Sequence, residues 1–487
     1  MTGNSNRIAD LTPEKRALVA SLLRKKRLAN GGQLDRNIVR IPRAQKLRAS
    51  IKQEVRWARQ RTLSGRPLNI GGAFRISGPL NIQALKAALN AMVQRHESLR
   101  TNFVLEENIL YQVISPTAQW DFPVVDLQTM SEQEQEVEVK RNIDQAALHD
   151  FDQSKELLVY GMLLCLASQQ FVLILALDHI ISDGWSRLLF LRELSVYYES
   201  FSTGQPASLP ELPIQYADFA FWERQQLEGD RLQALLSYWK LHLGNRLPRF
   251  ELPMDLPRPP TQQTRGASQR SLIPGDLTDL LRKLSYQEDC TLFITLLAAF
   301  QTLLYKFSQA DYVSVLSPSA NRTRPETEGL IGDFAHMVLY HTDFTDNPEF
   351  RVILHRVKQV MLDANAHQDL PFRDLMTRLF PDQVTQVGKT AFIQQLTGIC
   401  FSYEKVDQEI LRLGNLDVRP ILSEEVTAIL DLSFFMSEDQ TGLQLTAVYR
   451  DDLFHASTIE RMLDQYKAIL QKVAGTSGWL LSDLLTA

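Results

Sequence analysis

The segment GGAFRISG illustrates the pattern on which the first part of the chain is built. Phe74 and Ile76 alternate with Ala73 and Arg75, so the segment predicts a strand that presents these two pairs on opposite faces. After Asn81, apolar residues recur every three or four positions, which predicts a helix. The same two patterns predict further strands at residues 110–115, 158–167, 171–177, 311–319, 396–405 and 430–438. They also predict helices at residues 82–96, 185–201, 351–367 and 456–473, and two helices within 277–308.

An unbroken apolar run at residues 171–177 (FVLILAL) is typical of a strand that is covered on both faces. Strands and helices are mixed along the chain, which predicts the α/β class, as an α+β sandwich. With 487 residues the chain exceeds what one hydrophobic core supports, so we expect two lobes. Proline-rich stretches at 203–215 and 246–266 favour a boundary between them. The expected units are an N-terminal appendage (1–36), an N-terminal lobe (37–215), a connection (216–265) and a C-terminal lobe (266–487).

The N-terminal appendage contains one predicted helix over residues 12–29. Thr12 and Pro13 are a favourable helix start, and a basic run at 24–27 lies where the helix dipole favours cations. The helix is amphipathic, so we expect it either to pack on the main body or to serve as a docking element for another protein. Together with Met1 it would suit the natural N-terminus of a protein subunit.

Composition excludes several classes of protein. The chain is 44% hydrophobic and 22% charged, as soluble globular proteins are, and its formal net charge of -5 argues against nucleic-acid binding. Cys165, Cys290 and Cys400 show no paired spacing and lie in apolar stretches, which favours buried thiols in a reducing compartment. The sequence contains no apolar run of membrane-spanning length and no signal peptide. We therefore expect a cytoplasmic protein with no membrane partner.

The residues richest in chemistry follow the apolar strand, in the segment DHIISDGWS. His179 stands at the end of this strand, where the chain leaves the sheet and side chains reach a cleft, and a buried imidazole needs partners. Alternation along the strand places Asp178 on the opposite face, so only one of the two residues faces the cleft. Asp183 precedes Gly184, which permits a tight turn with positive φ, and its carboxylate could hold the loop or cap the next helix.

Two catalytic roles suit His179. An imidazole can accept a proton from an incoming amine or hydroxyl near neutral pH, or it can stabilise a charged tetrahedral intermediate by hydrogen bonding. The alternative is a core histidine that is bonded only to the backbone.

The segment resembles H-H-x-x-x-D-G, the active-site motif of condensation domains in nonribosomal peptide synthetases. Trp185 and Ser186 are typical of the subgroup that joins L-configured donors to L-configured acceptors. The shorter H-x-x-x-D-G is shared by the wider superfamily of chloramphenicol-acetyltransferase-like acyltransferases. Further segments resemble the family's other motifs, in family order and over nearly the whole chain: Ser50 to Trp57, Arg95 to Thr101, Tyr216 to Trp222, Ala320 to Pro325 with Ile331 to Phe334, and His367 to Phe372.

The resemblance implies two chloramphenicol-acetyltransferase-like lobes that form a V-shaped pseudo-dimer with a tunnel between them. His179 matches the family's critical histidine, and Gly184 matches the glycine that keeps the tunnel open. Arg100 matches an arginine that forms a structural ion pair with the aspartate at Asp183. A donor acyl thioester and an acceptor amine would enter the tunnel on the 4'-phosphopantetheine arms of carrier proteins. Amide (peptide) bond formation would follow, in an enclosure that excludes water.

This chain departs from the family pattern at its first motif histidine, which is Asp178 here. That position is mostly structural in the family, so the change need not end catalysis. Asp178 and Asp183 also satisfy D-x-x-x-x-D, the signature of heterocyclization domains, which condense substrates and then close a ring. The retained His179 and Gly184 argue against this alternative.

Two further departures affect the expected tunnel. The fifth motif reads Ala335-His336-Met337 where the family has Val-Asn-Thr, so His336 is a candidate to read a substrate. The segment 50–60 carries Lys52, Arg56 and Arg59 where the family is apolar, which favours an atypical donor such as a polyketide or fatty acyl chain. The candidate tunnel and substrate residues are Ser50, Gln53, Trp57, Asn321 and His336.

Two other classes of function remain open alongside amide formation. A degenerate condensation-like domain could serve as a docking platform for carrier proteins or tailoring enzymes, and a free-standing acyltransferase could use coenzyme A. The nine histidines show no metal-ligand spacing, and no phosphate-binding loop is present, so we expect this domain to bind neither a metal nor another cofactor of its own. The expected partners are donor and acceptor carrier proteins and neighbouring adenylation or polyketide synthase domains.

Overall fold

The computed structural model describes residues 37–485, except for short stretches within that range. The excepted residues are 63–66, 68, 246–249, 260–264, 388–391, 393–395, 406–410, 422–425 and 440. The helix predicted for residues 12–29 therefore lies outside the described residues.

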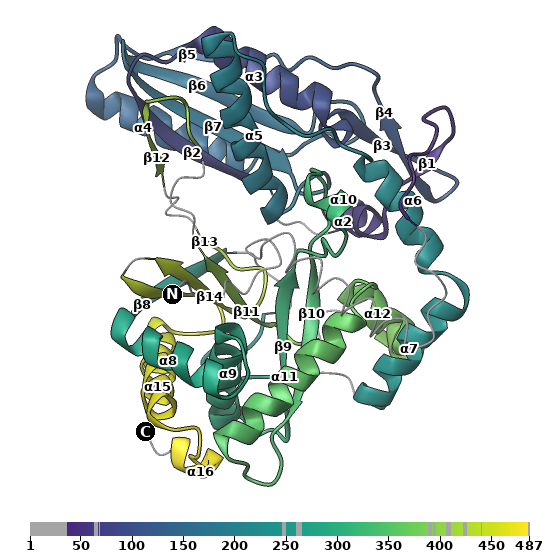
Figure 1. Ribbon diagram of the computed structural model, residues 1–487, viewed down its shortest axis with the longest axis vertical. Helices are drawn as coiled ribbons and strands as arrows, with labels where there is room; N and C mark the ends of the chain where they lie inside the picture. Colours follow the sequence, from purple (N-terminus) through teal and green to yellow (C-terminus); the bar gives the residue numbers. More distant parts are fainter. Residues whose placement is uncertain are drawn as a thin grey trace.

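The N-terminal lobe is built on a five-stranded sheet in which the predicted apolar strand is central (Figure 1). Its strands, in spatial order, are β12 (Asp417–Ile421), β2 (Asn69–Ser77), β7 (Gln170–Asp178), β6 (Val159–Ala167) and β5 (Val124–Asp126). Helices α3 (Ile82–Arg95) and α5 (Gly184–Thr203) cover one face, and α4 (Glu132–Ala147) covers the other. Phe74 and Ile76 belong to the core under α3 and α5, whereas Ala73 packs under α4, so the predicted alternation is confirmed.

A three-stranded antiparallel sheet extends this lobe beside the main sheet (Figure 1). Its strands are β1 (Leu47–Arg48), β4 (Ile109–Ile114) and β3 (Thr101–Glu106), and η2 (Glu97–Arg100) precedes β3. Helix α2 (Ile51–Thr62) follows β1 and contacts both lobes, because Ile51 belongs to the core of the C-terminal lobe and Trp57 to that of the N-terminal lobe.

The C-terminal lobe contains a seven-stranded mixed sheet below the first lobe in the view of Figure 1. Its strands, in spatial order, are β10 (His336–Asp343), β9 (Tyr312–Ser319), β11 (Ile399–Lys405), β14 (Leu432–Asp439), β15 (Gly442–Tyr449), β8 (Arg265–Pro274) and β13 (Val426–Thr427). Its helices are α8 (Gly275–Gln287), α9 (Leu292–Ser308), α10 (Pro325–Glu328), α11 (Phe350–Ala366), α12 (Phe372–Leu379), α13 (Pro381–Val387), α15 (Ala456–Gly475) and α16 (Leu481–Leu484).

Helix α9 fills the centre of this lobe, and most of its residues are buried. Among the described residues, no single helix is long and apolar enough to cross a membrane. Taken together, helices α8 and α9 have the length and composition of a membrane span, but the two helices are bent by 102° at their junction.

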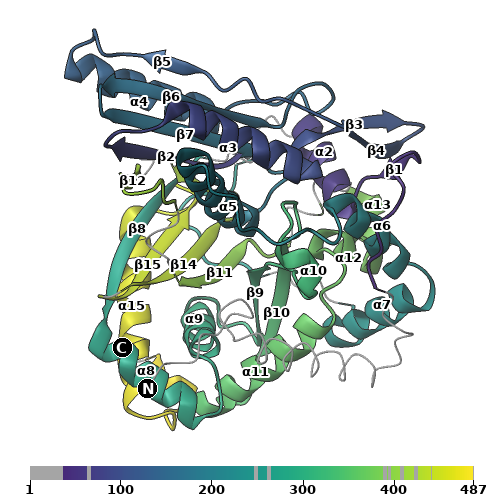
Figure 2. The same ribbon diagram turned by 45° about the horizontal axis from the view of Figure 1, so that its top comes forward.

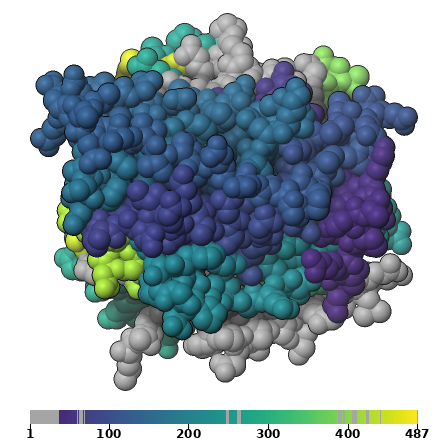
Figure 3. Space-filling model, turned by 90° about the horizontal axis from the view of Figure 1, so that it is seen from above, coloured from purple at the N-terminus to yellow at the C-terminus, as the bar shows by residue number. Residues whose placement is uncertain are grey.

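The strand exchange between the lobes differs from the expected division at residue 266. Strand β12 comes from the C-terminal part of the chain but pairs in antiparallel fashion with β2, and Leu411 and Leu413 join the N-terminal core. Figures 1 and 2 both place β12, in yellow-green, against β2. Seen from above, yellow-green atoms also emerge beside the blue N-terminal lobe (Figure 3). A lobe boundary defined by chain position alone misses such an exchange.

The predicted connection also contains regular structure. Residues 216–265 include α6 (Tyr216–Gln226) and α7 (Gly229–Leu243). Leu235, Trp239 and Leu243 of α7 are buried in the core of the C-terminal lobe, so α7 is part of that lobe. The apolar spacing on these helices was sufficient to predict them. The proline-rich stretches on either side led to the prediction of a connection instead.

Candidate active site

His179 lies in the first turn after β7, where the chain leaves the sheet. Ile181 donates a backbone hydrogen bond to the carbonyl of Asp178 at 3.1 Å, and the Ser182 hydroxyl donates to the same carbonyl at 2.9 Å. This tight turn carries the imidazole out of the sheet, and its Nδ1 lies 2.7 Å from the carbonyl oxygen of Ser182. The side chain is 22% exposed, as a group that must meet a substrate requires.

The contacts of the imidazole determine which nitrogen carries the proton. A carbonyl oxygen can only accept, so Nδ1 must be the protonated nitrogen that donates to Ser182. Nε2 then carries a lone pair, and it accepts a hydrogen bond from Nη2 of Arg56 at 3.0 Å. The site thus holds a neutral histidine whose Nε2 can only accept.

Charged side chains from α2 and from the C-terminal lobe meet this histidine. Lys52 and Arg56 stand four residues apart on α2, hence on one helical face, and both pair with the carboxylate of Asp333, at 3.2 and 3.0 Å. Asp333 is fully buried just before β10, and its Oδ1 lies 3.8 Å from Nδ1 of His179. This group of four residues is called the charged cluster below.

The pKa values within the charged cluster follow from burial and from its cations. Burial, with help from Arg56, lowers the pKa of His179 to about 4, against the opposing influence of Asp333. Burial alone would raise the pKa of Asp333, but Arg56 and Lys52 outweigh it and bring the pKa down to about 2. At neutral pH the imidazole is therefore neutral and the carboxylate is ionised.

Asp178 has contacts that are separate from those of the histidine beside it. Its Oδ1 accepts from the backbone N–H of Ile180 at 2.8 Å, and its Oδ2 accepts from Nε2 of Gln153 at 2.9 Å. Burial raises the pKa of this carboxyl, and the two hydrogen bonds oppose that rise. Asp178 braces the turn through these two hydrogen bonds.

Asp183 joins the two lobes. Its Oδ1 accepts from the backbone N–H of Ser186 at 2.7 Å and thereby caps α5. Its Oδ2 accepts from the N–H groups of Phe334 and Ala335, both at 3.0 Å, in the segment that enters β10 of the C-terminal lobe. The carboxylate is fully buried. The predicted helix cap is therefore observed, whereas the loop that the carboxylate holds is the one before β10 and not its own turn.

The ion pair predicted between Asp183 and Arg100 is wrong. Arg322 is the partner: its Nη2 lies 3.2 Å from Oδ1 of Asp183, and its Nη1 donates to the carbonyls of Thr327 and Leu330. Arg100 instead donates to the carbonyl of Ser115 at the end of the small sheet. Arg100 lies on η2 of the N-terminal lobe, whereas Arg322 comes from the opposite lobe, where the carboxylate points.

The residues after Asp183 continue the junction. Trp185 donates from its indole N–H to the carbonyl of Glu328 at 3.0 Å, and the hydroxyl of Ser186 lies 2.8 Å from the carbonyl of Gly332. Gly184 is the first residue of α5 and does not use positive φ, contrary to the expectation from its type. Open space surrounds its Cα, since an added Cβ would meet no atom within 4 Å.

Ser50, Gln53 and Trp57 hold α2 in place and are largely shielded. Ser50 and Gln53 cap the helix reciprocally, with each backbone N–H bonded to the other's side-chain oxygen, and the Ser50 hydroxyl lies 2.9 Å from that of Tyr216. Trp57 packs against Phe103 in the N-terminal core. The apolar and polar residues of this motif therefore position the face that carries Lys52 and Arg56.

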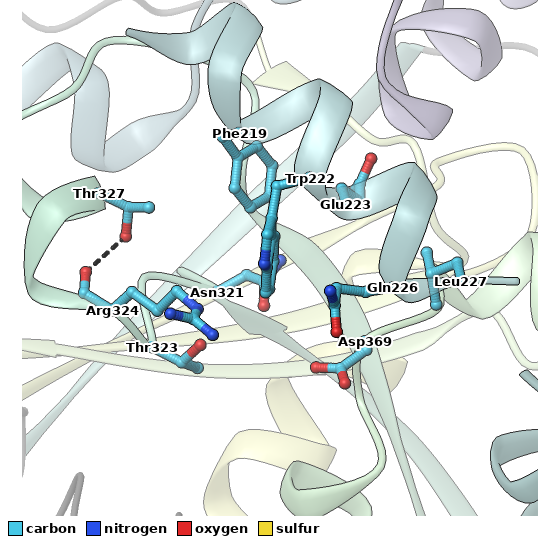
Figure 4. Close-up of a pocket in the computed structure, with 10 residues that line it drawn as sticks. All are labelled: Phe219, Trp222, Glu223, Gln226, Leu227, Asn321, Thr323, Arg324, Thr327 and Asp369. Atoms are coloured by element: carbon cyan, nitrogen blue, oxygen red, sulfur yellow. Dashed lines mark hydrogen bonds between the residues drawn. The ribbon is translucent and has the colours of Figure 1, made fainter. Parts of the chain in front are cut away.

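His336 and Asn321 lie in different surroundings within the C-terminal lobe. His336 is buried at the start of β10, and burial, with Lys52, lowers its pKa to about 3. Asn321 has positive φ and lines a cavity of about 20 Å³ together with Trp222 and Asp369 (Figure 4). Figure 4 shows Trp222 of α6 reaching down between Arg324 and Gln226. A cavity of this volume holds roughly one water molecule, so it is not itself a substrate site.

A larger cavity, of about 450 Å³, lies beside strands β2 and β7 of the N-terminal lobe. Its lining includes Gly71 and Gly72 of β2, Leu175 of β7, Arg187 of α5 and Leu411. This space is mostly apolar and lies next to the end of β7 from which His179 projects.

Sequence reasoning did not predict three contacts that complete the site. The contact of Arg56 with His179, the counter-ion Asp333 and the partner Arg322 come from segments far apart in the chain. The sequence offered one signal: α2 carries basic residues where the family motif is apolar. Arg322 and Asp333 lie inside recognised motifs, but no pattern in the sequence pairs them.

These observations define a two-lobed α/β protein with a strand-terminal histidine and a charged cluster where the lobes meet. The model of the condensation domain family matches residues 45–486, and the chain belongs to that family. Its family reaction is peptide-bond formation in nonribosomal peptide synthetases.

Curated relatives agree with this assignment. One protein of the linear gramicidin synthase of Brevibacillus parabrevis is 38% identical over 440 residues, which are 90% of this chain and 6% of the relative. Phosphinothricin tripeptide synthetase PhsC of Streptomyces viridochromogenes is 32% identical over 482 residues, 98% of this chain and 44% of the relative. The chain thus spans less than half the length of either protein.

Solved structures bear out the fold. The X-domain from teicoplanin biosynthesis, solved in complex with OxyB, has a TM-score of 0.80 at 22% identity and covers 93% of this chain and 99% of that one. The first condensation domain of the calcium-dependent antibiotic synthetase, in complex with a substrate analogue, has a TM-score of 0.70 at 17% identity, with 90% and 98% covered. The predicted chloramphenicol-acetyltransferase-like fold is therefore confirmed, and no match favours the heterocyclization alternative.

Proposed function

We propose that this chain forms an amide bond between two carrier-bound substrates, with His179 as the proton acceptor. The observation that carries the proposal is the neutral, fixed imidazole, whose Nδ1 donates to the carbonyl of Ser182 and whose Nε2 keeps its lone pair at the junction of the lobes. The donor would be an acyl or peptidyl thioester and the acceptor an amine, each on a 4'-phosphopantetheine arm.

The tautomer separates the two roles that His179 could play. A neutral imidazole with its only N–H bound to Ser182 has no proton to donate from Nε2, so it is poorly suited to stabilise an oxyanion. Once the acceptor amine takes the place of Arg56 at Nε2, the imidazole can accept a hydrogen bond from that amine and orient its lone pair toward the thioester. A pKa of about 4 makes it a weak base, so orientation contributes more than proton affinity.

The reaction balances without a cofactor of this domain. The amine nitrogen attacks the thioester carbonyl, the new C–N bond forms, and the C–S bond breaks as the tetrahedral intermediate collapses. The proton lost by the amine passes to Nε2 of His179 and then to the departing thiolate of the donor arm. The enclosing lobes would exclude water, which otherwise hydrolyses the thioester.

Other parts of the proposal concern the surroundings of the domain. Donor and acceptor carrier proteins are the expected partners, with adenylation or polyketide synthase domains beside them. A cytoplasmic location stays a prediction.

A transfer assay tests the proposal. A donor-loaded and an acceptor-loaded carrier protein are mixed with the chain, and the mass of the acceptor arm is followed for wild type, His179→Ala and Asp178→His. We expect the donor mass to move to the acceptor in wild type and in Asp178→His, and transfer to collapse in His179→Ala.

Two other outcomes would redirect the proposal. A product lighter by one water that disappears in Asp178→His would support heterocyclization. Absence of transfer with aminoacyl, fatty acyl and polyketide donors alike would overturn the proposal and leave a docking platform.

A further inference from the structure

Attack of an amine on a thioester carbonyl places a negative charge on the carbonyl oxygen, and this oxyanion needs a hydrogen-bond donor. His179 cannot supply the donor, because its Nδ1–H is bonded to the carbonyl of Ser182 and its Nε2 has only a lone pair. Stabilisation of the oxyanion is the largest single contribution to catalysis in many acyl-transfer enzymes. A second residue beside Nε2 must therefore carry this role.

Several side-chain donors around the histidine are already used to hold the fold. Ser182, Tyr216 and Trp185 each donate their side-chain hydrogen to a backbone carbonyl. Lys52 is buried, and its ammonium pairs with the carboxylate of Asp333 at 3.2 Å. These contacts stabilise the turn and the junction of the lobes, so a substrate could use these donors only by breaking that junction.

Arg56 is held at one edge of its guanidinium and open at the other. Its Nε pairs with Oδ2 of Asp333 at 3.0 Å, and its Nη2 lies 3.0 Å from Nε2 of His179. Its Nη1 forms no hydrogen bond with the residues that the structure describes. The Arg56 side chain is 20% exposed, close to the 22% of His179, whereas Asp333 is fully buried. The anchored edge therefore faces the interior, and the terminal nitrogens lie with the imidazole on the accessible side.

We propose that Arg56 is a second catalytic residue, which donates from its terminal nitrogens to the oxyanion of the tetrahedral intermediate. The inference rests on the proposed function, because it adds a residue to the same reaction. Arg56 stands where the family motif is apolar, so this donor is particular to chains that carry the arginine.

The positions of the reacting atoms favour this role. In the intermediate, the amine nitrogen and the oxyanion are bonded to the same carbon. When the amine takes the place of Nη2 at Nε2 of His179, the oxyanion therefore lies within reach of the displaced guanidinium, which binds it by charge-assisted hydrogen bonds. The carbonyl π electrons move to the oxygen as the C–N bond forms. Collapse restores the carbonyl and breaks the C–S bond, while the amine proton passes through Nε2 to the departing thiolate.

The rate of Arg56→Met distinguishes an oxyanion donor from a group that only blocks Nε2. Arg56 helps to lower the pKa of His179, so its removal leaves a stronger base with a free lone pair. A blocking arginine would therefore make Arg56→Met faster than wild type. For an oxyanion donor we expect the reverse: kcat at saturating concentrations of both carriers falls by about 10²- to 10³-fold. The KM for each carrier should stay within about threefold, because the contact forms only in the intermediate.

A conservative variant and chemical rescue separate catalysis from folding. In Arg56→Lys the cation for Asp333 is kept, but lysine is one bond shorter and its ammonium reaches only the position of the guanidinium carbon. We expect kcat to fall by about tenfold or more, with an unchanged midpoint of urea denaturation. Ethylguanidinium, added well below denaturing concentrations, should raise the kcat of Arg56→Ala by about tenfold or more and leave His179→Ala inactive.

Arg61→Ala is the matched control for these variants. It removes an arginine from the same helix, one whose guanidinium stacks on Trp57, and it should retain the kcat of wild type. A kcat for Arg56→Met equal to or above that of wild type, or a folded Arg56→Ala that ethylguanidinium does not rescue, would overturn the catalytic role of Arg56. Either result leaves the proposed function standing as long as wild type transfers the donor. No transfer by wild type with any donor overturns both proposals.

Discussion

The two ends of the segment 178–186 have opposite environments. At one end His179 is partly exposed, has a lowered pKa and accepts a hydrogen bond from a cation that also pairs with Asp333. At the other end Asp183 is fully buried, and donors from two lobes satisfy it: the N–H groups of Ser186, Phe334 and Ala335, the hydroxyl of Ser186 and the guanidinium of Arg322.

The difference teaches that the short motif combines a reactive group with its support. The catalytic end can stay partly exposed to a substrate because the other end holds the strand turn, the start of α5 and the C-terminal lobe together. Chemistry and stability should therefore separate when the two ends are changed one at a time.

The largest effect is expected for His179→Ala. Transfer should fall by about 10²- to 10⁴-fold, the range for loss of an acid–base group. The free energy of unfolding should change by about 2 kcal/mol or less, because the hydrogen bonds to the carbonyl of Ser182 and from Arg56 are lost. Single-turnover mass measurements and urea denaturation give the two quantities. His355→Ala, an exposed histidine on α11, is the control, and transfer within threefold of wild type in His179→Ala would remove this residue from the mechanism.

Asp183→Ala should produce the opposite profile, a loss of stability first. The change leaves Arg322 buried and unpaired and removes the acceptor of three backbone N–H groups, which we expect to cost about 3–5 kcal/mol in unfolding free energy. Asp279→Ala, at an exposed position, should cost little. A loss below about 1 kcal/mol in Asp183→Ala would show that the lobes are held together elsewhere.

Arg322→Met and Arg100→Met compare the observed ion-pair partner with the expected one. Arg322 bonds to Asp183 and to two carbonyls in the interior, whereas Arg100 bonds to one carbonyl at the edge of the small sheet. Arg322→Met should be the more destabilising by about 2 kcal/mol in denaturant unfolding. The reverse order would restore Arg100 as the partner of Asp183.

A smaller effect is expected for Asp178→Asn. The asparagine keeps an acceptor for the N–H of Ile180, and Gln153 can turn its amide, because its Oε1 has no other partner among the described residues. Stability should change by less than about 1 kcal/mol, with transfer retained. A large loss of transfer with unchanged unfolding would assign Asp178 a chemical role.

The last comparison concerns the titration of His179. The folded pKa of about 4 lies below the value near 6.5 of an unfolded histidine, so the unfolded state binds more protons between these pH values, and stability falls as the pH is lowered through that window. His179→Gln should therefore lose less stability than wild type between pH 7 and pH 5, in urea denaturation at both values. Arg56→Leu should raise the pKa of His179 as followed by NMR, and an unchanged pKa would mean that burial alone sets it.

Individual residues show how far the sequence carries the site. The alternation of Phe74 and Ala73 and the apolar run before Asp178 placed the strands, and the turn at His179 followed from them. Lys52 and Arg56 stood out as charges on an otherwise apolar motif. Their target could not be predicted, because Asp333 lies 277 residues beyond Arg56 and sequence spacing carries no distance in space.

The sequence by itself determined the family, the central strand and the histidine at its end, because these depend on local periodicity and a contiguous motif. Only the tertiary structure decided which arginine pairs with Asp183, that β12 crosses into the opposite sheet, and that two cations of α2 pair with one carboxylate beside His179. The reason is physical: hydrogen bonds and ion pairs depend on distances of about 3 Å, and these distances arise only when segments far apart in the chain are packed together.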